Sequence, residues 1–498
     1  MSIETIPFDT RYEALKSRDA RFDGRFFTGV VTTGVYCRPV CPAKTPKAEN
    51  VRFFECAAAA EAAGFRPCRR CRPETAPGTP AWLGTSATVG RALRLIGEGA
   101  LDTGGVDDLA ERLGLGSRHL RRLFDEHLGA SPLDVALTRR VHFARKLLDE
   151  TDLPVRDIAF AAGFASVRRF HFVMARTFGA KPTELRRAAR GRAPAAAEGH
   201  VALRLPYREP YEFDAILEYL GERATAGVEE VRGGVYRRTF RLDGDAGVLA
   251  VRRDARAACL LLEVPIAARK RFLEIAERVR RVFDVGADPA SIAEHLARDP
   301  ALRRSARGRP GLRVPGAWDP FELSVRAILG QQVSVAGATT LAGRLVERWG
   351  ERVPGADETG PHRLFPEPAV LARANVASIG MPGTRGAAIR ELARRVADGT
   401  LPLTWGADAE KAVQALAQVR GIGAWTVGYV AMRALGLPDA FLEGDLGVRR
   451  ALAKRKGELP SPSEVLVRAE AWRPWRAYAV IHLWASAGAA ASRRGGSR

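Results

Sequence analysis

The chain has 498 residues, of which 78 are Lys or Arg and 57 are Asp or Glu, so its formal net charge is +21. This length predicts about three or four domains of roughly 100–200 residues each and excludes a single small module. With 46% hydrophobic and 27% charged residues, the composition is that of a globular protein and excludes wholesale disorder.

The positive charge favours a polyanionic partner, because cationic surfaces release counterions when they bind nucleic acid. Ribosomal, membrane-surface and merely Arg-rich proteins share this property. The longest weakly charged stretch, 477–491, contains His482 and Ser486 and is shorter than the roughly 20 apolar residues of a membrane span. The N-terminus has an early acid, Glu4, and no apolar signal region. We therefore expect a cytoplasmic, nucleoid-associated protein with no membrane partner.

Pro-, Gly- and Ala-rich stretches at 73–80 and 190–199 predict linkers, and a softer break lies near 286–289. These breaks predict four domains, which span residues 1–76, 80–190, 200–286 and 287–498. The second domain has short helical patterns such as 106–113. The third has strand patterns at 235–242 and 259–264 and a helical pattern at 213–223, and the fourth is helical, for example at 321–329 and 410–419. The expected fold is multidomain and mainly α, with α+β parts.

Four of the six cysteines form two close pairs, Cys37 with Cys41 and Cys68 with Cys71. Paired thiolates at this spacing can close a tetrahedral zinc site, and about 10–16 kcal/mol of binding free energy then contributes to the folding of a small module. We predict one Zn²⁺ on these four ligands and no organic cofactor. Four unrelated buried cysteines are the alternative, and spacing leaves open whether the zinc site is structural or reactive.

The segments 32–41, 49–54 and 63–73, which contain these cysteines, closely resemble the N-terminal zinc domain of the Ada adaptive-response proteins. The resemblance implies that Cys37 takes a methyl group irreversibly from a methylphosphotriester of the DNA backbone, and that the methylated form binds its promoter more tightly. A zinc-bound thiolate is deprotonated yet nucleophilic, and its methylation removes one negative charge that repels phosphate.

A helix-turn-helix pattern covers residues 158–182, and a weaker one covers 108–127. In the stronger pattern Gly163 suits the turn, Ser166 can cap the second helix, and Phe170 and Phe178 can face the core. This arrangement predicts a helix beginning at Ser166 with its aromatic side chains buried.

Arg168 and Arg169 should then point outward, and residues 166–192 carry eight basic side chains against one acid, Glu184. A solvated charged surface is the alternative interpretation of this run. The pattern resembles the AraC-type DNA-binding domain, and its position after the zinc module is similar to that in Ada. The resemblance implies two recognition helices, near 117–127 and 166–177, in adjacent major-groove segments, with RNA polymerase as the expected protein partner.

An Ada protein would usually continue into an O6-alkylguanine methyltransferase domain with a Pro-Cys-His-Arg motif, and that motif is absent from this sequence. Residues 201–498 instead resemble the 3-methyladenine DNA glycosylase II (AlkA) family over nearly their whole length. The matching segments, in chain order, are 321–334, 420–429, 438–445 and 472–479. The resemblance implies an α/β N-terminal domain followed by an all-α helix-hairpin-helix glycosylase domain.

Asp445 has two interpretations. It precedes the helical pattern 446–452, so local sequence favours a helix N-cap. The AlkA resemblance implies instead a catalytic aspartate, which could still cap the helix, because a carboxylate beside the sugar stabilises an oxocarbenium-like transition state and can orient water. Gly421 and Gly423 are similar to a helix-hairpin-helix, whose backbone amides approach a DNA phosphate; an ordinary helix–helix turn is the alternative.

Trp425 and Tyr429 are four residues apart and therefore share one helix face, and the resemblance aligns Trp484 with a third aromatic of the base pocket. Each ring could favour a flipped cationic base by about 0.5–2 kcal/mol; core packing is the alternative. Bifunctional relatives place a Schiff-base lysine at the position of Trp425, so lyase activity should be absent. The resemblance also aligns Gln332 with the wedge residue, which enters the base stack after the target base has flipped out. Leucine has been the paradigm at this position.

The preferred hypothesis is a bifunctional, monomeric alkylation-response protein that binds double-stranded DNA: a methyl-sensing transcriptional regulator fused to a monofunctional glycosylase that excises bases such as 3-methyladenine. One alternative is a regulator whose glycosylase-like half only binds damaged DNA. Another keeps excision as the sole activity and treats residues 1–190 as a DNA-targeting tether. Asp445 with its aromatic neighbours counts against the first alternative, and Cys37 with the second helix-turn-helix counts against the other.

Overall fold

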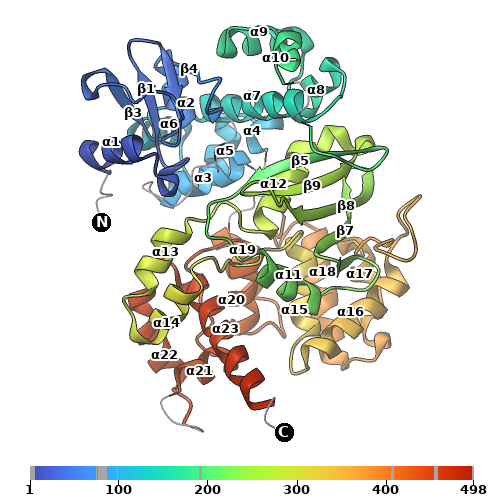
Figure 1. Cartoon of the computed structure of the whole chain (residues 1–498). Coiled ribbons are helices and arrows are strands. Elements are labelled where there is room, and N and C mark those ends of the chain that lie inside the picture. Colours follow the sequence, from blue (N-terminus) through green and yellow to red (C-terminus); the bar gives the residue numbers. More distant parts are fainter. Residues whose placement is uncertain are drawn as a thin grey trace. The chain divides into compact units, whose positions relative to one another are not determined.

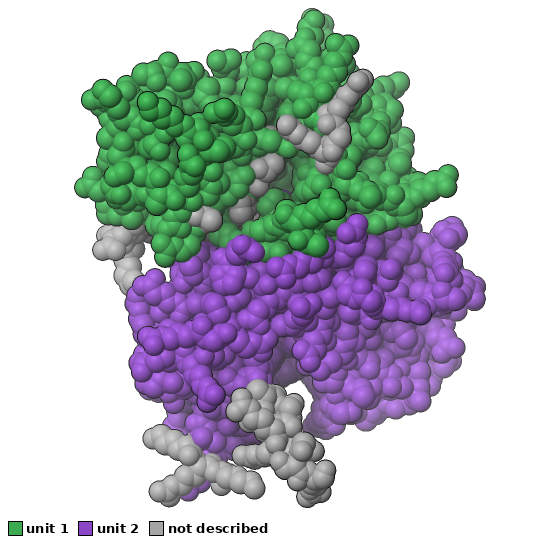
Figure 2. All heavy atoms as spheres, in the orientation of Figure 1, with its two compact units in different colours: residues 1–208, 242–245, 254–278 green, residues 209–241, 246–253, 279–498 purple. Residues whose placement is uncertain are grey.

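The computed structural model (Figure 1) describes residues 6–73, 76, 87–97, 99–189, 193–404, 409–453 and 458–495. The chain forms two compact units (Figure 2). Unit 1 comprises residues 1–208, 242–245 and 254–278, and unit 2 comprises residues 209–241, 246–253 and 279–498. The predicted linker at 73–80 lies outside the described residues except for Pro73 and Ala76, as do residues 190–192 of the second linker. The four domain ranges therefore stay predictions.

Unit 1 begins with a small four-stranded sheet of order β3-β1-β2-β4. Its strands and flanking helices are α1 (Phe8–Ser17), η1 (Ala20–Phe22), β1 (Phe27–Val30), β2 (Val35–Cys37), η2 (Ala48–Asn50), β3 (Val51–Phe54), α2 (Ala57–Ala62) and β4 (Arg66–Pro67). Strand β1 is antiparallel to β2 and β3, whereas β4 runs parallel to β2, with Tyr36 opposite Pro67. Phe27, Tyr36, Ala60 and Phe65 form the core under this sheet. The parallel pairing brings the ends of β2 and β4, and hence both cysteine pairs, to the same edge.

The next part of unit 1 is a bundle of short helices around the long helix α7 (Figure 1). The helices are α3 (Ala87–Gly97), α4 (Ala100–Thr103), α5 (Val106–Arg112), α6 (Ser117–Leu128), α7 (Pro132–Glu150), α8 (Val155–Ala161), α9 (Val167–Phe178) and α10 (Pro182–Arg187). Helices are present at both places where recognition helices are expected, as α6 and α9. Gly163 has a φ of +80° in the turn before α9, and Ser166 caps that helix by accepting a bond of 3.4 Å from the Arg169 amide. Phe170 and Phe178 are buried, as predicted.

A second sheet has the strand order β5-β9-β8-β7-β6. Unit 1 contains β5 (His200–Pro206) and β9 (Cys259–Pro265), which are antiparallel with His200 opposite Pro265. Unit 2 contains β6 (Glu229–Arg232) and most of β7 (Val235–Leu242) and β8 (Asp245–Arg253). Two glycines of positive φ join β6 to β7, as a tight hairpin turn requires. The predicted strands at 235–242 and 259–264 and the predicted helix at 213–223 are confirmed.

Unit 2 is otherwise helical. Helix η4 (Ile266–Arg271) belongs to unit 1, and α12 (Phe272–Val282) starts there and continues into unit 2. The other helices of unit 2 are α11 (Phe213–Glu222), α13 (Pro289–Leu296), α14 (Pro300–Gly308), α15 (Pro320–Leu329), α16 (Val335–Trp349), α17 (Pro368–Arg373), η5 (Val376–Ile379), α18 (Gly383–Ala397), α19 (Ala409–Ala417), α20 (Ala424–Arg433), α21 (Leu446–Leu452), α22 (Pro462–Ala469), η6 (Glu470–Trp472) and α23 (Arg476–Gly495). Asp288, Asp299 and Asp319 each cap a helix that has proline at its first position, a combination that starts helices strongly. Helix α15 is buried along most of its length and forms the centre of this unit. Across the described residues, no helix has the length and apolar character that a bilayer crossing requires.

Candidate zinc centre, DNA-reading helices and base pocket

The structure brings the four predicted zinc ligands together. Cys37 ends β2, Cys41 follows in the next turn, and Cys68 and Cys71 come directly after β4. All four thiols are buried and free of disulfides, and their sulfur atoms lie within 4.8 Å of one another. Tetrahedral coordination at about 2.3 Å needs sulfur atoms about 3.8 Å apart, so this donor set fits zinc. The thiols are buried to the same degree, so burial does not distinguish Cys37 from the others.

Arg38 supports the cysteine cluster from the side. Its backbone N–H donates to Cys71 Sγ over 3.3 Å, and its guanidinium binds the Cys71 carbonyl and the buried carboxylate of Asp23. Such outer contacts orient metal ligands and stabilise thiolate charge. Cys56 and Cys259 lie outside this cluster. The Cys56 thiol contacts the Leu128 carbonyl oxygen, and the Cys259 thiol contacts the Asp254 carboxylate. Burial raises the pKa of Cys56 to about 11, which makes it a poor nucleophile.

Helices α6 and α9 have exposed basic faces. Helix α9 exposes Arg168 and Arg169, as predicted, and helix α6 exposes Arg118 and Arg121 in its first turns. Each helix ends in a glycine with a left-handed backbone, Gly129 or Gly179. Both halves of the helix-turn-helix pair therefore have a basic face available to phosphate or base edges.

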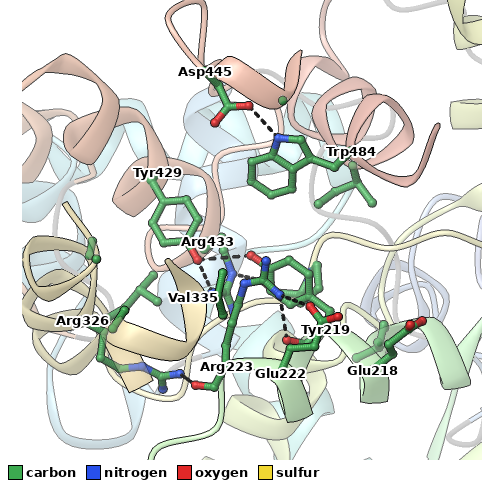
Figure 3. A pocket seen from close by; sticks show the side chains of 18 of the residues that line it. Glu218, Tyr219, Glu222, Arg223, Arg326, Val335, Tyr429, Arg433, Asp445 and Trp484 are labelled. Atoms are coloured by element: carbon green, nitrogen blue, oxygen red, sulfur yellow. Dashed lines mark hydrogen bonds and ion pairs between the residues drawn. The ribbon is translucent and has the colours of Figure 1, made fainter. Parts of the chain in front are cut away.

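In unit 2 the structure brings Asp445, Trp425, Tyr429 and Trp484 together around one pocket. Figure 3 shows Asp445, Tyr429 and Trp484 of this group. Asp445 caps α21: its Oδ1 accepts from the Val448 amide over 2.8 Å. The same carboxylate accepts a bond of 2.8 Å from Trp484 Nε1 at Oδ1 and one of 2.9 Å from Trp425 Nε1 at Oδ2. Both interpretations of Asp445 are therefore compatible, because the N-cap residue also lines a pocket.

The pocket is a cavity of about 840 Å³ with aromatic walls. The rings of Trp425 and Tyr429 stack 5.0 Å apart with planes inclined by 11°, as their spacing on one helix face predicted. Trp425 is 37% exposed, whereas Tyr429 is buried. This combination of a partly open indole, a buried phenol and a fixed carboxylate can receive a flat base and hold a negative charge beside its sugar.

Sequence reasoning missed Tyr219 and Arg433. The Tyr219 ring stacks on Trp484 at 6.4 Å, and its hydroxyl lies 3.1 Å from the Tyr429 hydroxyl. Arg433 Nη1 donates to the Tyr429 hydroxyl over 2.7 Å (Figure 3). Arg433 follows Tyr429 by four residues, so helical spacing could have indicated it. Tyr219 belongs to α11, 206 positions before Trp425, and no local signal marks it.

The positive charges below the pocket act on its two phenols. Burial opposes ionisation of Tyr429, but the guanidinium groups of Arg433 and Arg223 and the hydrogen bonds from Tyr219 and Arg433 hold its pKa below the usual range. Burial raises the pKa of Tyr219, which keeps that hydroxyl protonated. Arg223 also lies over the Tyr219 ring, 3.9 Å from its centroid. The floor of the pocket is therefore polar and cationic beneath its aromatic walls.

The predicted hairpin glycines lie between α19 and α20. Gly421 has a φ of +90°, and Gly423 is the N-cap of α20, with open space where a Cβ would stand. Gln331 Nε2 donates to the Gly421 carbonyl over 3.0 Å and so ties this turn to the loop between α15 and α16. The next residue, Gln332, is exposed and has a φ of +58°, a strained conformation for a residue with a side chain. The structure thus places the predicted wedge residue in a loop anchored to the hairpin.

Four family models match the chain in order: "Metal binding domain of Ada" over residues 10–74, "Helix-turn-helix domain" over 109–188, "AlkA N-terminal domain" over 202–319 and "HhH-GPD superfamily base excision DNA repair protein" over 325–477. A relative from Mycobacterium tuberculosis, "Probable bifunctional transcriptional activator/DNA repair enzyme AlkA", is 43% identical over 96% of each chain. DNA-3-methyladenine glycosylase 2 of Escherichia coli is 35% identical over 57% of this chain and 97% of its own length. "Bifunctional transcriptional activator/DNA repair enzyme Ada" of E. coli is 39% identical over 25% of this chain and 34% of its own length.

The class of protein that the fold and sites define is a multidomain DNA-binding protein with a zinc-binding module, a helix-turn-helix domain and a helix-hairpin-helix glycosylase fold. The chain belongs to the family of bifunctional transcriptional activator/DNA repair enzymes of the AlkA type.

Proposed function

We propose that this protein excises alkylated bases such as 3-methyladenine from double-stranded DNA by hydrolysing the N-glycosidic bond. The observation that carries the proposal is the Asp445 carboxylate, which two indole N–H groups and a helix N-terminus fix at an aromatic pocket. In the transition state the sugar carries positive charge, so a preorganised carboxylate lowers its free energy and can orient the attacking water. An N-alkylated purine is itself cationic and leaves readily.

The other pocket and loop residues supply binding. Trp425, Tyr429 and Trp484 would hold the flipped base by stacking and cation–π attraction. Gly421 and Gly423 would let backbone amides at the start of α20 approach a phosphate, and Gln332 would enter the stack that the base leaves. No lysine stands at position 425 to form a Schiff base, so the glycosylase would be monofunctional.

The substitution Asp445→Asn tests this function. Asparagine can still cap α21 and accept the Trp484 hydrogen bond at its amide oxygen, but its NH2 group cannot accept from Trp425 and it lacks the negative charge. We expect release of 3-methyladenine from methylated duplex DNA to fall by about 10²–10³-fold, while the affinity for an abasic-site analogue is retained. Single-turnover base release, run beside undamaged DNA, measures the effect. Unchanged release by the variant would remove Asp445 from this role, and no release by the wild type would leave only damage binding.

The N-terminal half supports a second proposed activity, a single-turnover methyl transfer to Cys37 on one zinc ion held by Cys37, Cys41, Cys68 and Cys71. The clustered donor set supports the metal, and the Ada resemblance selects Cys37 among four equally buried thiols. When bound, zinc would keep the sulfur as a thiolate at neutral pH. Cys37 would then attack the methyl carbon of a methylphosphotriester and release the phosphodiester.

Peptide mass spectrometry tests this transfer. After incubation of the zinc-loaded protein with DNA that carries methylphosphotriesters, we expect one added methyl group on the peptide that contains Cys37. Unmethylated DNA is the control and should add none. A methyl group on Cys68 or another ligand would reassign the acceptor, and no added mass on any cysteine would contradict the transfer.

The helix-turn-helix pair would bind promoter DNA through α6 and α9, with Arg168 and Arg169 at the DNA surface. At the promoter the protein would also contact RNA polymerase. The four domains would span residues 1–76, 80–190, 200–286 and 287–498. We expect the protein to act as a cytoplasmic, nucleoid-associated monomer that needs no organic cofactor. Methylation of Cys37 would remove one negative charge near the DNA and so strengthen promoter binding.

A further inference from the structure

Helix α9 has an aromatic side chain in the middle of its basic outer face. Its inner face buries Phe170, Val173, Met174 and Phe178. Its outer face exposes Arg168, Arg169, Phe172 and Arg176, and the Phe172 ring is 62% exposed. Phe172 lies one helical turn after Arg168 and one turn before Arg176, so guanidinium groups flank it along the helix. Within the described part of the chain, this ring stacks on no other aromatic ring and no cation lies over it.

The helix that carries Phe172 is held firmly at both ends. Ser166 caps its N-terminus, and Arg69 of the second cysteine pair donates to the carbonyls of Phe178 and Gly179 at its C-terminus, over 3.0 and 3.5 Å. Phe172 is therefore a rigidly mounted apolar group on a cationic surface. Cationic residues attract the phosphates of DNA, whereas an apolar group can contribute to DNA binding only where a base edge is itself apolar.

The partner helix α6 differs at the same place. Phe172 comes seven residues before Gly179, and Arg122 comes seven residues before Gly129, the corresponding end of α6. Arg122 is exposed and carries donors that suit the acceptor atoms of guanine. In the major groove only thymine presents a methyl group, its C5-methyl, to an apolar side chain. The two helices therefore present opposite chemistry at equivalent positions.

We propose that Phe172 packs against the C5-methyl group of a thymine in the major groove, and that α9 thereby selects thymine at one position of the regulatory DNA site. This inference rests on the proposed regulatory function and adds a specificity residue to it. Arg168, Arg169 and Arg176 hold the helix on the phosphates around that base, and Phe172 supplies discrimination between thymine and bases without the methyl group.

The test uses the full-length, zinc-loaded protein. Preferred sites are first selected from random duplex DNA, and each thymine of the selected site is then replaced singly by uracil, which lacks only the methyl group. We expect one replacement to weaken wild-type binding by about fourfold, the equivalent of one buried methyl group. Phe172→Ala should bind the unmodified site about tenfold more weakly and should be indifferent to that replacement.

Phe160→Ala is the matched control, because Phe160 is an exposed phenylalanine of α8 in the same helix-turn-helix. It should keep both the wild-type affinity and the wild-type sensitivity to uracil. A thermal unfolding profile of Phe172→Ala equal to that of the wild type shows that its weaker binding is not a folding defect. If no uracil replacement weakens binding to the selected site, the inference about Phe172 is wrong while the regulatory function stands. The same conclusion follows if Phe172→Ala keeps the wild-type sensitivity to uracil. Failure to select any preferred sequence would overturn the regulatory function with it.

Discussion

At the scale of single residues, Asp445 shows how one side chain serves structure and chemistry together. Three N–H groups hold its carboxylate: the indoles of Trp425 and Trp484 and the backbone amide of Val448. Hydrogen bonds to an ionised group are worth about 1.5–3 kcal/mol each. They fix the orientation of the carboxylate before a substrate arrives, and such preorganisation is what makes a charge effective in a transition state.

Trp425→Phe tests this orientation. The phenyl ring can still stack on Tyr429, but the N–H donor to Asp445 Oδ2 is lost. We expect single-turnover release of 3-methyladenine to fall by about tenfold or more, because one charge-assisted hydrogen bond no longer orients the carboxylate. Trp349→Phe removes an indole N–H at the end of α16, outside the pocket lining, and should leave the rate unchanged. A wild-type rate in Trp425→Phe would show that this donor has no part in catalysis.

At the scale of secondary-structure elements, buried polar contacts attach the central helix α15 to the hairpin β6–β7. Arg326 pairs with Glu229 over 2.6 Å, and Arg238 pairs with Glu322 over 2.8 Å, and all four side chains are largely shielded from water. Removing one partner of such a pair leaves an uncompensated buried charge, which costs about 3–5 kcal/mol. The network thus fixes the helix that precedes the Gln332 loop.

Helix α23 depends on a second polar contact. His482 is buried, and its Nδ1 lies 2.8 Å from Ser305 Oγ of α14. Burial, with a smaller contribution from Arg309, lowers the pKa of His482 to about 4. Because the unfolded chain takes up this proton near pH 6.5 and the folded chain only near pH 4, the contribution of His482 to stability is lost as the pH falls through this window.

We therefore expect the free energy of unfolding of the wild type, relative to His482→Gln, to fall by about 2 kcal/mol between pH 7 and pH 5. The comparison with the variant cancels other groups that titrate in this range, such as Asp284, whose pKa burial raises to about 6. Urea unfolding followed by tryptophan fluorescence measures the difference, since seven of the eight tryptophans lie between residues 318 and 484. A difference that does not change with pH would contradict the buried neutral state of His482.

Many elements could be predicted from the sequence because their signals are local. Ser166, Gly163 and the alternation at 235–242 predicted a cap, a turn and a strand, and the structure confirms each. The contacts made by Tyr219 could not be predicted in this way. They join α11 to α20 and α23, and nothing within one helical turn of Tyr219 reflects a partner some 200 residues away.

At the scale of the whole molecule, the basic residues behind the net charge of +21 have two uses. In unit 1 the basic side chains of α6 and α9 are exposed, where they can meet phosphate. Other arginines are buried in both units and serve the fold, as Arg145 does beside Asp149 in unit 1 and Arg238 beside Glu322 in unit 2. Charge arithmetic indicates a polyanionic partner but does not separate these two uses.

The sequence by itself determined the family, the clustered cysteines, the helices α6 and α9 and the carboxylate with its neighbouring aromatics, because each depends on residues that are close together in the chain or in a motif of regular spacing. Tertiary structure alone decided that Asp445 is held by two indoles, that Tyr219 and Arg433 form the polar floor of the pocket, and that Phe172 stands exposed among arginines. The physical reason is that burial, stacking and hydrogen bonding depend on which surfaces come into contact when the chain folds. Those contacts join segments far apart in the sequence, and the residues around one segment do not indicate its partner.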